Sequence, residues 1–348
     1  MTAALHSTLK RAGIRNGYKV IGPAQALYAY ENRLSLLEYT YNLIKETEYS
    51  DMLDINGMHQ YTRPNTKKGY ENTVYEPFAS YSLAEENFVY YNQLLKENNL
   101  RDKEFWCDEY FAHAPDAKWW NNVGMQMTQF AAGLTAGINN GVNRFLTWQM
   151  FDTLWDSDDL NGAATGDSEK GGGVHTVGTC PSLIKVDGKS CPNGESCGCN
   201  RYTYSSYIPR VTYYGINLIG KYMNCENAKV FASEVINNDA REKGGVYVSA
   251  IENDEGQTVI LVANTMPTVS SVDINLEKRN ITNFARYTYN PDEIVATPEA
   301  KSIASDKKIV LEGATSFKDV VPAGSFVIYV ASKAKYGADI DLDFPFEF

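Results

Sequence analysis

Residues 104–111 read EFWCDEYF, an apolar run in which the adjacent carboxylates Asp108 and Glu109 precede two aromatic residues. Its length and its aromatic content are typical of a β-strand with a buried face. Three further runs of this kind occur along the chain, YKVIGPA (18–24), MLDINGMHQY (52–61) and NRFLTWQMF (143–151). Segments with apolar residues every three or four positions follow them, most clearly over 27–47. This alternation predicts parallel βα units.

The pattern changes after Cys225, where apolar and polar residues alternate and no helical spacing recurs. Seven short strands are expected, over 228–233, 245–253, 257–265, 271–278, 284–290, 307–313 and 325–332. Turn sequences such as the one at 253–256 separate them, which is typical of an antiparallel β-sandwich. The sequence thus predicts an α/β part over 1–224, a β-sandwich over 225–334 and a tail over 335–348.

Composition excludes some classes of partner. The net charge is −11 and the pI is about 5.0, so a nucleic acid is not expected to bind, because phosphate backbones require a basic surface. No apolar run reaches the ~20 residues of a membrane-spanning helix. The first residues are charged where a signal peptide would be apolar. The 24 tyrosines present flat faces that suit sugar rings, or they fill helix–sheet interfaces.

Four of the six cysteines fall within residues 180–199. The spacing lacks the paired C-x2-C units of a zinc site, and no histidine lies inside it, so a disulfide-linked loop is favoured over a metal site. Disulfides form in oxidising compartments. The cluster therefore predicts an extracellular or secretory location, and a metal-binding interaction protein built on it is the weaker alternative.

Four strand–helix units followed by a β-sandwich resemble the C-terminal part of the clan A glycoside hydrolases, nearest to families 39 and 30. In that resemblance VIGPA (20–24), DINGMHQY (54–61), FWCDEYF (105–111) and FLTWQMFD (145–152) are similar to barrel strands five to eight. VVPAGSFVIYV (320–330) is similar to the closing strands of the accessory sandwich. The resemblance implies the C-terminal half of a (β/α)8 TIM barrel followed by that sandwich.

The resemblance also implies roles for individual residues. Glu109, at the end of the third strand, would be the nucleophile of a retaining enzyme, and Tyr61 would orient it through its hydroxyl. His59, Trp148, Gln25 and Trp155 would bind substrate. Plainer interpretations are a surface carboxylate for Glu109, a core histidine for His59 and barrel packing for Trp148. Alternation along the strand predicts that Asp108 points away from the side of Glu109.

In the same families the acid/base glutamate follows an asparagine at the end of strand four, and the sequence contains no Asn-Glu pair. Four strands do not close a barrel. We therefore expect a missing N-terminal half, a homodimer that completes the barrel, or a remnant without activity. The predicted function is a retaining glycosidase acting on a β-linked poly- or oligosaccharide, with no cofactor and no metal, and with doubtful activity in this chain alone. The alternative is a non-catalytic carbohydrate-binding or adhesion protein.

Overall fold

The computed structural model describes residues 2–27, 42, 52–62, 79–100, 102–112, 123–147, 154–155, 175–176, 184–189, 203–209, 211–236, 245–276, 281–294 and 302–331. The chain begins with helix α1 (Thr2–Arg11) and the short 3-10 helix η1 (Arg15–Gly17). Asp54 fixes this segment to the start of the following sheet. Its carboxylate pairs with Arg15 at 2.7 Å and accepts the backbone N–H of Val20 at 2.6 Å.

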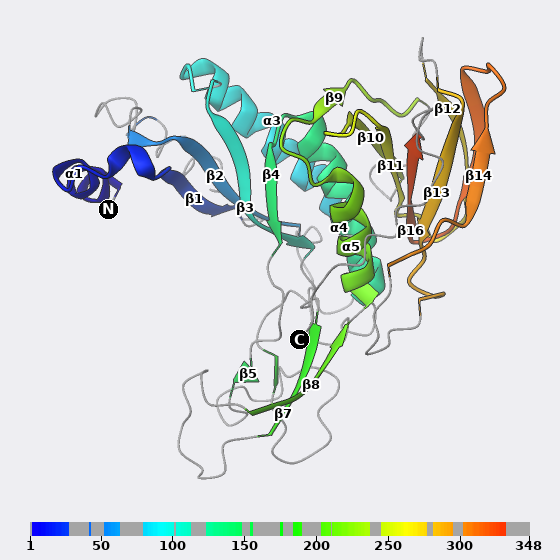
Figure 1. Ribbon diagram of the computed structural model, residues 1–348, viewed down its shortest axis with the longest axis horizontal. Helices are drawn as coiled ribbons and strands as arrows, with labels where there is room; N and C mark the ends of the chain where they lie inside the picture. Colours follow the sequence, from blue (N-terminus) through cyan, green and yellow to red (C-terminus); the bar gives the residue numbers. More distant parts are fainter. Residues whose placement is uncertain are drawn as a thin grey trace.

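A four-stranded parallel sheet forms the first half of the molecule (Figure 1). Its order follows the chain: β1 (Ile21–Leu27), β2 (Ile55–Thr62), β3 (Glu104–Ala112) and β4 (Arg144–Thr147). Each strand lies within or beside one of the four apolar runs, and every neighbouring pair is parallel. Helices α3 (Ala79–Glu97) and α4 (Val123–Asn139) make the crossovers after β2 and β3. Of the segment 27–47, in which a helix is expected, residues 28–41 and 43–47 lie outside the described residues.

The core between this sheet and its helices is aromatic. Phe105 and Tyr110 of β3 are fully buried, and so are Phe88 and Tyr91 of α3. The rings of Tyr91 and Phe105 stack with centroids 4.7 Å apart. The Tyr91 hydroxyl donates to the Gly57 carbonyl at 2.9 Å. Truncation of one such ring to alanine costs about 3–5 kcal/mol, so this layer holds β2 and β3 firmly in place.

The second half begins with helix α5 (Val211–Met223), as its apolar spacing predicts. A six-stranded antiparallel sheet follows, in the order β14-β13-β16-β11-β10-β9, with a two-stranded sheet, β12-β15, beside it. The strands are β9 (Lys229–Phe231), β10 (Val246–Glu252), β11 (Thr258–Asn264), β12 (Ser270–Asn275), β13 (Asn283–Tyr289), β14 (Lys307–Val310), β15 (Ser316–Val321) and β16 (Ser325–Ala331). Seven of them lie at predicted positions, and β15 was not predicted.

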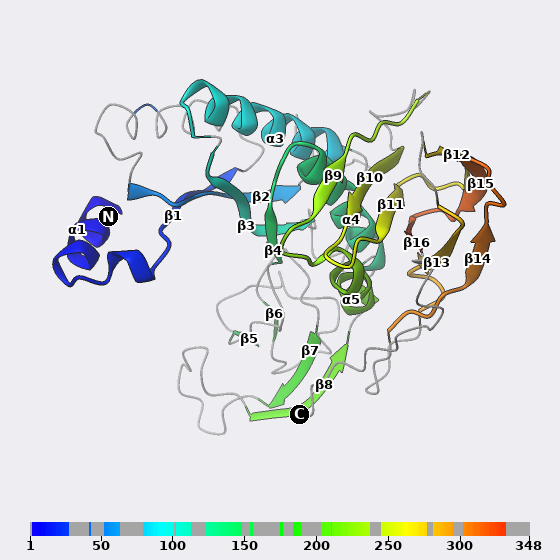
Figure 2. The same ribbon diagram turned by 45° about the horizontal axis from the view of Figure 1, so that its top comes forward.

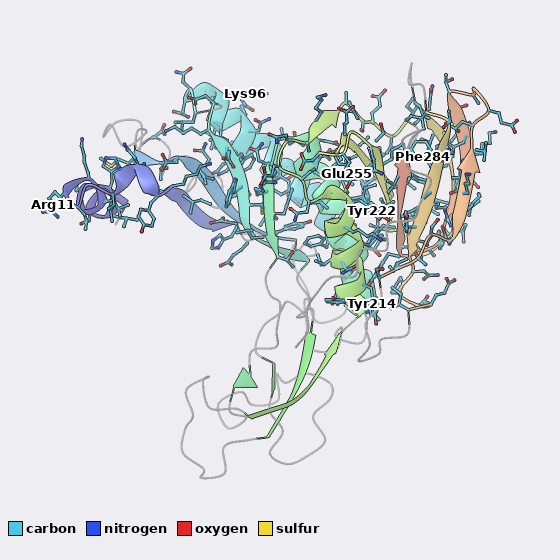
Figure 3. All side chains as sticks on the ribbon, viewed as in Figure 1. Arg11, Lys96, Tyr214, Tyr222, Glu255 and Phe284 are labelled. Carbon is cyan, nitrogen blue, oxygen red and sulfur yellow. The ribbon has the colours of Figure 1, made fainter. Side chains whose placement is uncertain are left out.

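One face of the six-stranded sheet packs on α4 and α5, and the other face packs against β12 and β15 (Figure 2). Tyr222, labelled in Figure 3, lies on α5 with its ring centroid 4.8 Å from that of Tyr287 on β13. The Thr128 hydroxyl of α4 donates to the Gly324 carbonyl before β16 at 2.6 Å. Helix α4 is therefore covered by a sheet on each side, and the two halves share one continuous hydrophobic core.

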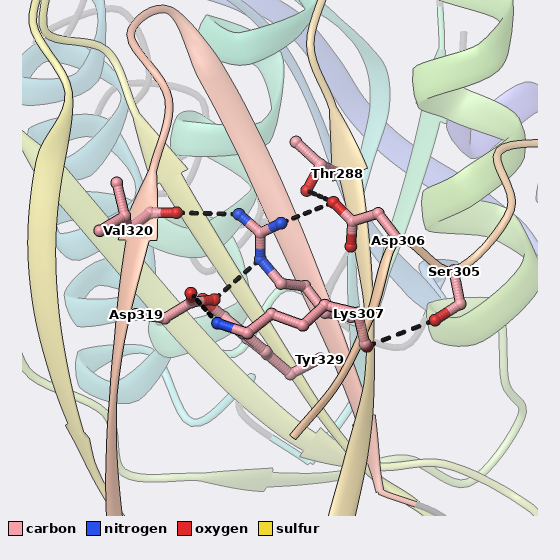
Figure 4. A network of polar contacts seen from close by, with 8 residues as sticks. Thr288, Ser305, Asp306, Lys307, Asp319, Val320 and Tyr329 are labelled. Atoms are coloured by element: carbon pink, nitrogen blue, oxygen red, sulfur yellow. Dashed lines mark hydrogen bonds and ion pairs between the residues drawn. The ribbon is translucent and has the colours of Figure 1, made fainter.

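A polar network joins the strands of the antiparallel half (Figure 4). Asp319 of β15 is almost fully buried, and it pairs with Arg286 and Lys307 at 2.8 Å each. The Tyr329 hydroxyl donates to the same carboxylate at 2.9 Å. Arg286 also pairs with Asp306 at 2.5 Å. The buried charge of Asp319 is thus matched by two cations.

Two short antiparallel pairs lie between β4 and α5, where the sequence predicts only a long loop. They are β5 (Leu154–Trp155) with β6 (His175–Thr176), and β7 (Ile184–Lys189) with β8 (Thr203–Pro209). The four clustered cysteines and the tail over 335–348 fall outside the described residues. Within the described part, Cys107 and Cys225 are buried free thiols.

No helix in the described part of the chain is both long enough and apolar enough to cross a membrane.

Candidate active site

The strand β3 contains an irregularity at Asp108 and Glu109. In its pairing with β2, Met58 lies opposite Cys107 but His59 lies opposite Glu109, so that Asp108 is an extra residue. The pairing with β4 shifts over the same stretch, from Cys107 to Tyr110. In a β-bulge two residues oppose one, and the side chains beyond it change faces. Tyr110 therefore takes the buried position on the helix side, next after Cys107.

This bulge corrects the prediction for Asp108. Simple alternation would direct Asp108 and Glu109 to opposite faces of the sheet. Instead both carboxylates reach the same residue, His59 of β2. The expectation that Asp108 points away from the side of Glu109 is wrong, because alternation holds only while the ladder is regular.

His59 lies between the two carboxylates. Its Nδ1 is 3.2 Å from Glu109 Oε2, and its Nε2 is 3.7 Å from Asp108 Oδ2. The exposed fraction of the side chain is 21% for His59, 28% for Glu109 and 12% for Asp108. Glu109 is the most open of the three, as a group that must meet a ligand should be, and Asp108 is the most enclosed.

These surroundings alter the pKa of His59. Burial lowers the pKa, whereas the Asp108 carboxylate and the charge of Glu109 raise it, and the net result lies above the ordinary histidine value. The imidazolium therefore persists to higher pH than it would in an unperturbed histidine. On the helix side of the same strand, burial raises the pKa of the Cys107 thiol well above its usual value, so that the thiol stays uncharged.

Gly57 makes room for this cluster. A Cβ at this position would lie 2.7 Å from Ile21 Cγ1 of β1 and 3.2 Å from Asp108 Oδ2. The first distance is shorter than side chains tolerate, and the second places a methyl group against the carboxylate. Because Gly57 has no side chain, Ile21 of β1 and the carboxylate of Asp108 can both pack against the backbone of β2 at this position.

The cluster lies just past the middle of β2 and β3, toward the C-terminal edge at which α/β folds place their active sites. The opposite end carries a separate ion pair. Glu104, the first residue of β3, pairs with Lys19 at 2.6 Å and accepts from Trp106 Nε1 at 2.7 Å. Hydrogen bonds from Lys19 and Trp106 hold the pKa of Glu104 below its usual value. We assign this pair to stability.

The other predicted site residues are placed only in part. Gln25 of β1 pairs through its backbone with Met58, and Tyr61 of β2 pairs with Phe111. The side chains of Gln25 and Tyr61 lie outside the described part, as does that of Trp155, whose backbone forms β5. Trp148 lies wholly outside the described residues. Their roles stay predictions.

Among the described residues, no group of three or more histidine, cysteine or carboxylate side chains could hold a metal ion. Independently of that finding, a histidine in contact with two carboxylates has the groups that acid–base or nucleophilic chemistry requires. Asp108 was not predicted as a site residue. The sequence has aromatic residues both before and after it, as a regular strand would have, so no local pattern marks the bulge.

The sequence matches no protein-family profile and no curated relative. Solved structures with a similar fold do exist. A family 30 endoxylanase from Clostridium papyrosolvens is 16% identical with a TM-score of 0.51, over 95% of this chain and 61% of that chain. The chain therefore shares its fold with this glycoside hydrolase of known structure.

Two further structures share this fold. An α-L-arabinofuranosidase from Thermotoga maritima has a TM-score of 0.54 at 14% identity, over 95% of this chain and 61% of that chain. A conserved exported protein from Bacteroides fragilis has a TM-score of 0.54 at 14% identity, over 95% and 58%. The chain thus spans about three fifths of the length of these proteins.

Proposed function

We propose that this protein is a retaining glycoside hydrolase acting on β-linked poly- or oligosaccharides outside the cell, with Glu109 as the nucleophile. In this proposal residues 1–224 supply strands five to eight of a (β/α)8 barrel, residues 225–334 form the accessory β-sandwich and residues 335–348 form a tail. A missing half or a second copy would close the barrel. The fold shared with endoxylanase and arabinofuranosidase structures supports the proposal.

The observation that carries the proposal is the position of Glu109. The bulge in β3 turns this carboxylate away from the helix side near the C-terminal end of a parallel sheet, where it contacts His59 and stays partly open. A retaining glycosidase requires a carboxylate at such an edge, within reach of the anomeric carbon of a bound sugar.

In the proposed reaction Glu109 attacks the anomeric carbon and forms a covalent glycosyl ester while the leaving oxygen departs. Water then hydrolyses the ester. Tyr61 orients Glu109, and Trp148, Gln25 and Trp155 contact the sugar. The second carboxyl group of such enzymes lies about 5–5.5 Å from the first and protonates the leaving oxygen. Without that group the rate falls by roughly 10²–10⁴-fold.

The proposal is tested with a reagent that requires no proton donor. The chain is incubated with 2-fluoro β-glycosides of xylose, glucose and xylobiose that carry dinitrophenolate as leaving group. The fluorine slows hydrolysis of the ester, so that the glycosyl enzyme accumulates and is located by peptide mass spectrometry. We expect one sugar per chain on the peptide that contains Glu109.

The matched control is Glu97→Gln, an exposed position on α3, which should be labelled as the wild type is. Glu109→Gln should not be labelled. A wild-type chain that stays unlabelled by every sugar, or label that persists in Glu109→Gln, contradicts the proposal. Binding of xylan that survives Glu109→Gln in an unlabelled chain would instead indicate the non-catalytic carbohydrate-binding protein.

A further inference from the structure

The contact of one imidazole with two carboxylates has a chemical consequence. A neutral imidazole carries one N–H, so it donates to one carboxylate and turns a lone pair toward the other. Glu109 and Asp108 face different ring nitrogens of His59, Nδ1 and Nε2. With both carboxyl groups ionised, both contacts are favourable when both ring nitrogens carry a proton. The arrangement is therefore a cation held between two anions.

Asp108 has few other ways to balance its charge. Its side chain is 12% exposed, and among the described residues its Oδ1 is buried with no hydrogen-bond partner. An enclosed carboxylate is costly unless a cation compensates it. Of the strands beside β2, β1 reads IGPAQAL and carries no titratable side chain, and among the described residues β3 brings Asp108 and Glu109 to His59. Tyr110 of β3 is turned to the helix side, and Tyr61 lies two residues further along β2.

We propose that Asp108 is a positioning residue for Glu109 that acts through His59. Asp108 holds the ring protonated and oriented, and the ring holds Glu109 Oε2 on its Nδ1. The positioning role of Asp108 rests on the proposed function, in which Glu109 is the nucleophile. The coupling of Asp108 to His59 does not depend on that function.

The proposal has a defined pH dependence. Because the pKa of His59 is raised in the folded chain, the cation persists to higher pH there than in the unfolded chain. The stabilisation is complete below the unfolded pKa of about 6.5, and it is lost as the pH rises through the folded pKa. The contact between Nδ1 and Glu109 should therefore weaken on the alkaline side.

The coupling is measured without any turnover. The chain contains four histidines, so ¹⁵N-histidine NMR resolves each titration, and His59→Gln identifies the resonance of His59. We expect Asp108→Asn to move the His59 titration to lower pH. The control Asp102→Asn, which removes an exposed carboxylate just before β3, should leave it in place. An unchanged His59 titration in Asp108→Asn would overturn the inference.

Labelling kinetics give the second measurement. Asp108→Asn should slow labelling of Glu109 by the 2-fluoro reagent about 10- to 100-fold, the effect of misplacing a reacting group. In a His59→Gln background the same change should have no further effect, because Asp108 acts through the ring. If the effects of Asp108→Asn and His59→Gln on the labelling rate were additive, Asp108 would not act through His59, and the inference would be overturned. A general loss of stability in each variant would also give additive effects, so the comparison separates the two explanations.

The two proposals fail separately. Label on Glu109 together with a His59 titration that ignores Asp108 would remove the inference and leave the nucleophile in place. A shifted titration without label on Glu109 would remove the proposed function and leave the coupling of the three side chains.

Discussion

At the scale of single residues, the site depends on one irregular position. Asp108 and Glu109 both reach His59 because a bulge interrupts β3. The resemblance to clan A glycoside hydrolases implied that Glu109 and His59 are site residues, and the structure places them 3.2 Å apart. The sequence did not identify Asp108, since alternation predicts the opposite face. Pairing with a neighbouring strand, which the sequence does not show, decides the face.

Gly57 gives a prediction at this scale. Gly57→Ala should lower the free energy of unfolding by about 1–3 kcal/mol, as overpacking does, because the new methyl group would lie 2.7 Å from Ile21 Cγ1. It should also disturb the His59 titration, since the methyl group approaches Asp108 Oδ2 at 3.2 Å. Urea unfolding and ¹⁵N-histidine NMR measure the two effects.

Gly220→Ala is the matched control. An added Cβ at Gly220 of α5 meets nothing within 4 Å, and alanine is favoured over glycine in a helix by up to about 1 kcal/mol. This variant should be as stable as the wild type or slightly more stable. Equal stabilities for Gly57→Ala and Gly220→Ala would show that β2 has room for a side chain here.

At the scale of elements, β15 shows why a strand was missed. Its burial alternates as a strand should, with Phe317, Asp319 and Val321 turned inward. The middle inward residue is a carboxylate, which breaks the apolar alternation used to recognise strands. Arg286 and Lys307, together with the Tyr329 hydroxyl, surround Asp319 and make that burial tolerable. The other strands of this half carry apolar inward residues and were predicted.

The buried charge of Asp319 predicts a pH-dependent stability. Burial raises its pKa, but hydrogen bonds from Lys307 and Tyr329 and the charge of Arg286 outweigh burial, so the pKa lies below its usual value. Stability from Asp319 is thus present above the unfolded pKa of about 3.9 and is lost as the pH falls through the folded pKa. Asp319→Asn should cost about 3–5 kcal/mol at pH 7.

Denaturant unfolding at pH 7 and in acid measures this effect. Asp306→Asn is the control, because Asp306 pairs with the same Arg286 but its side chain is 39% exposed, and exposed pairs contribute about 0–1 kcal/mol. The difference between Asp319→Asn and the wild type should shrink in acid. A similar small loss for both variants at pH 7 would refute a stabilising role for the network.

At the scale of the whole molecule, helix α4 joins the two halves. Its sequence, VGMQMTQFAAGLTAGIN, is apolar on nearly all sides, because α4 lies between the parallel sheet and the antiparallel sheet. The sequence predicted the helix but placed a domain boundary near 224. The structure adds that the hydrophobic core is continuous across that position.

Thr128 tests this junction. Thr128→Val keeps the shape of the side chain but removes the donor to the Gly324 carbonyl, and a carbonyl left without its donor in a buried site costs about 1–3 kcal/mol. Thr135→Val is the control on the same helix, since its hydroxyl donates to the Ala132 carbonyl within α4. Thermal unfolding should show the larger loss for Thr128→Val. Equal losses would mean that the contact between the halves adds nothing.

The sequence by itself determined the order of the elements, because helical and strand periodicities are local properties that side chains impose on their own segment. It therefore predicted four βα units and seven of the eight later strands, whereas the roles of Glu109 and His59 were implied by the resemblance to a known family. Only the tertiary structure decided which side chains meet. The bulge that brings Asp108 to His59, the cations around Asp319 and the shared core at α4 all depend on residues distant in the chain, whose pairing no local pattern specifies.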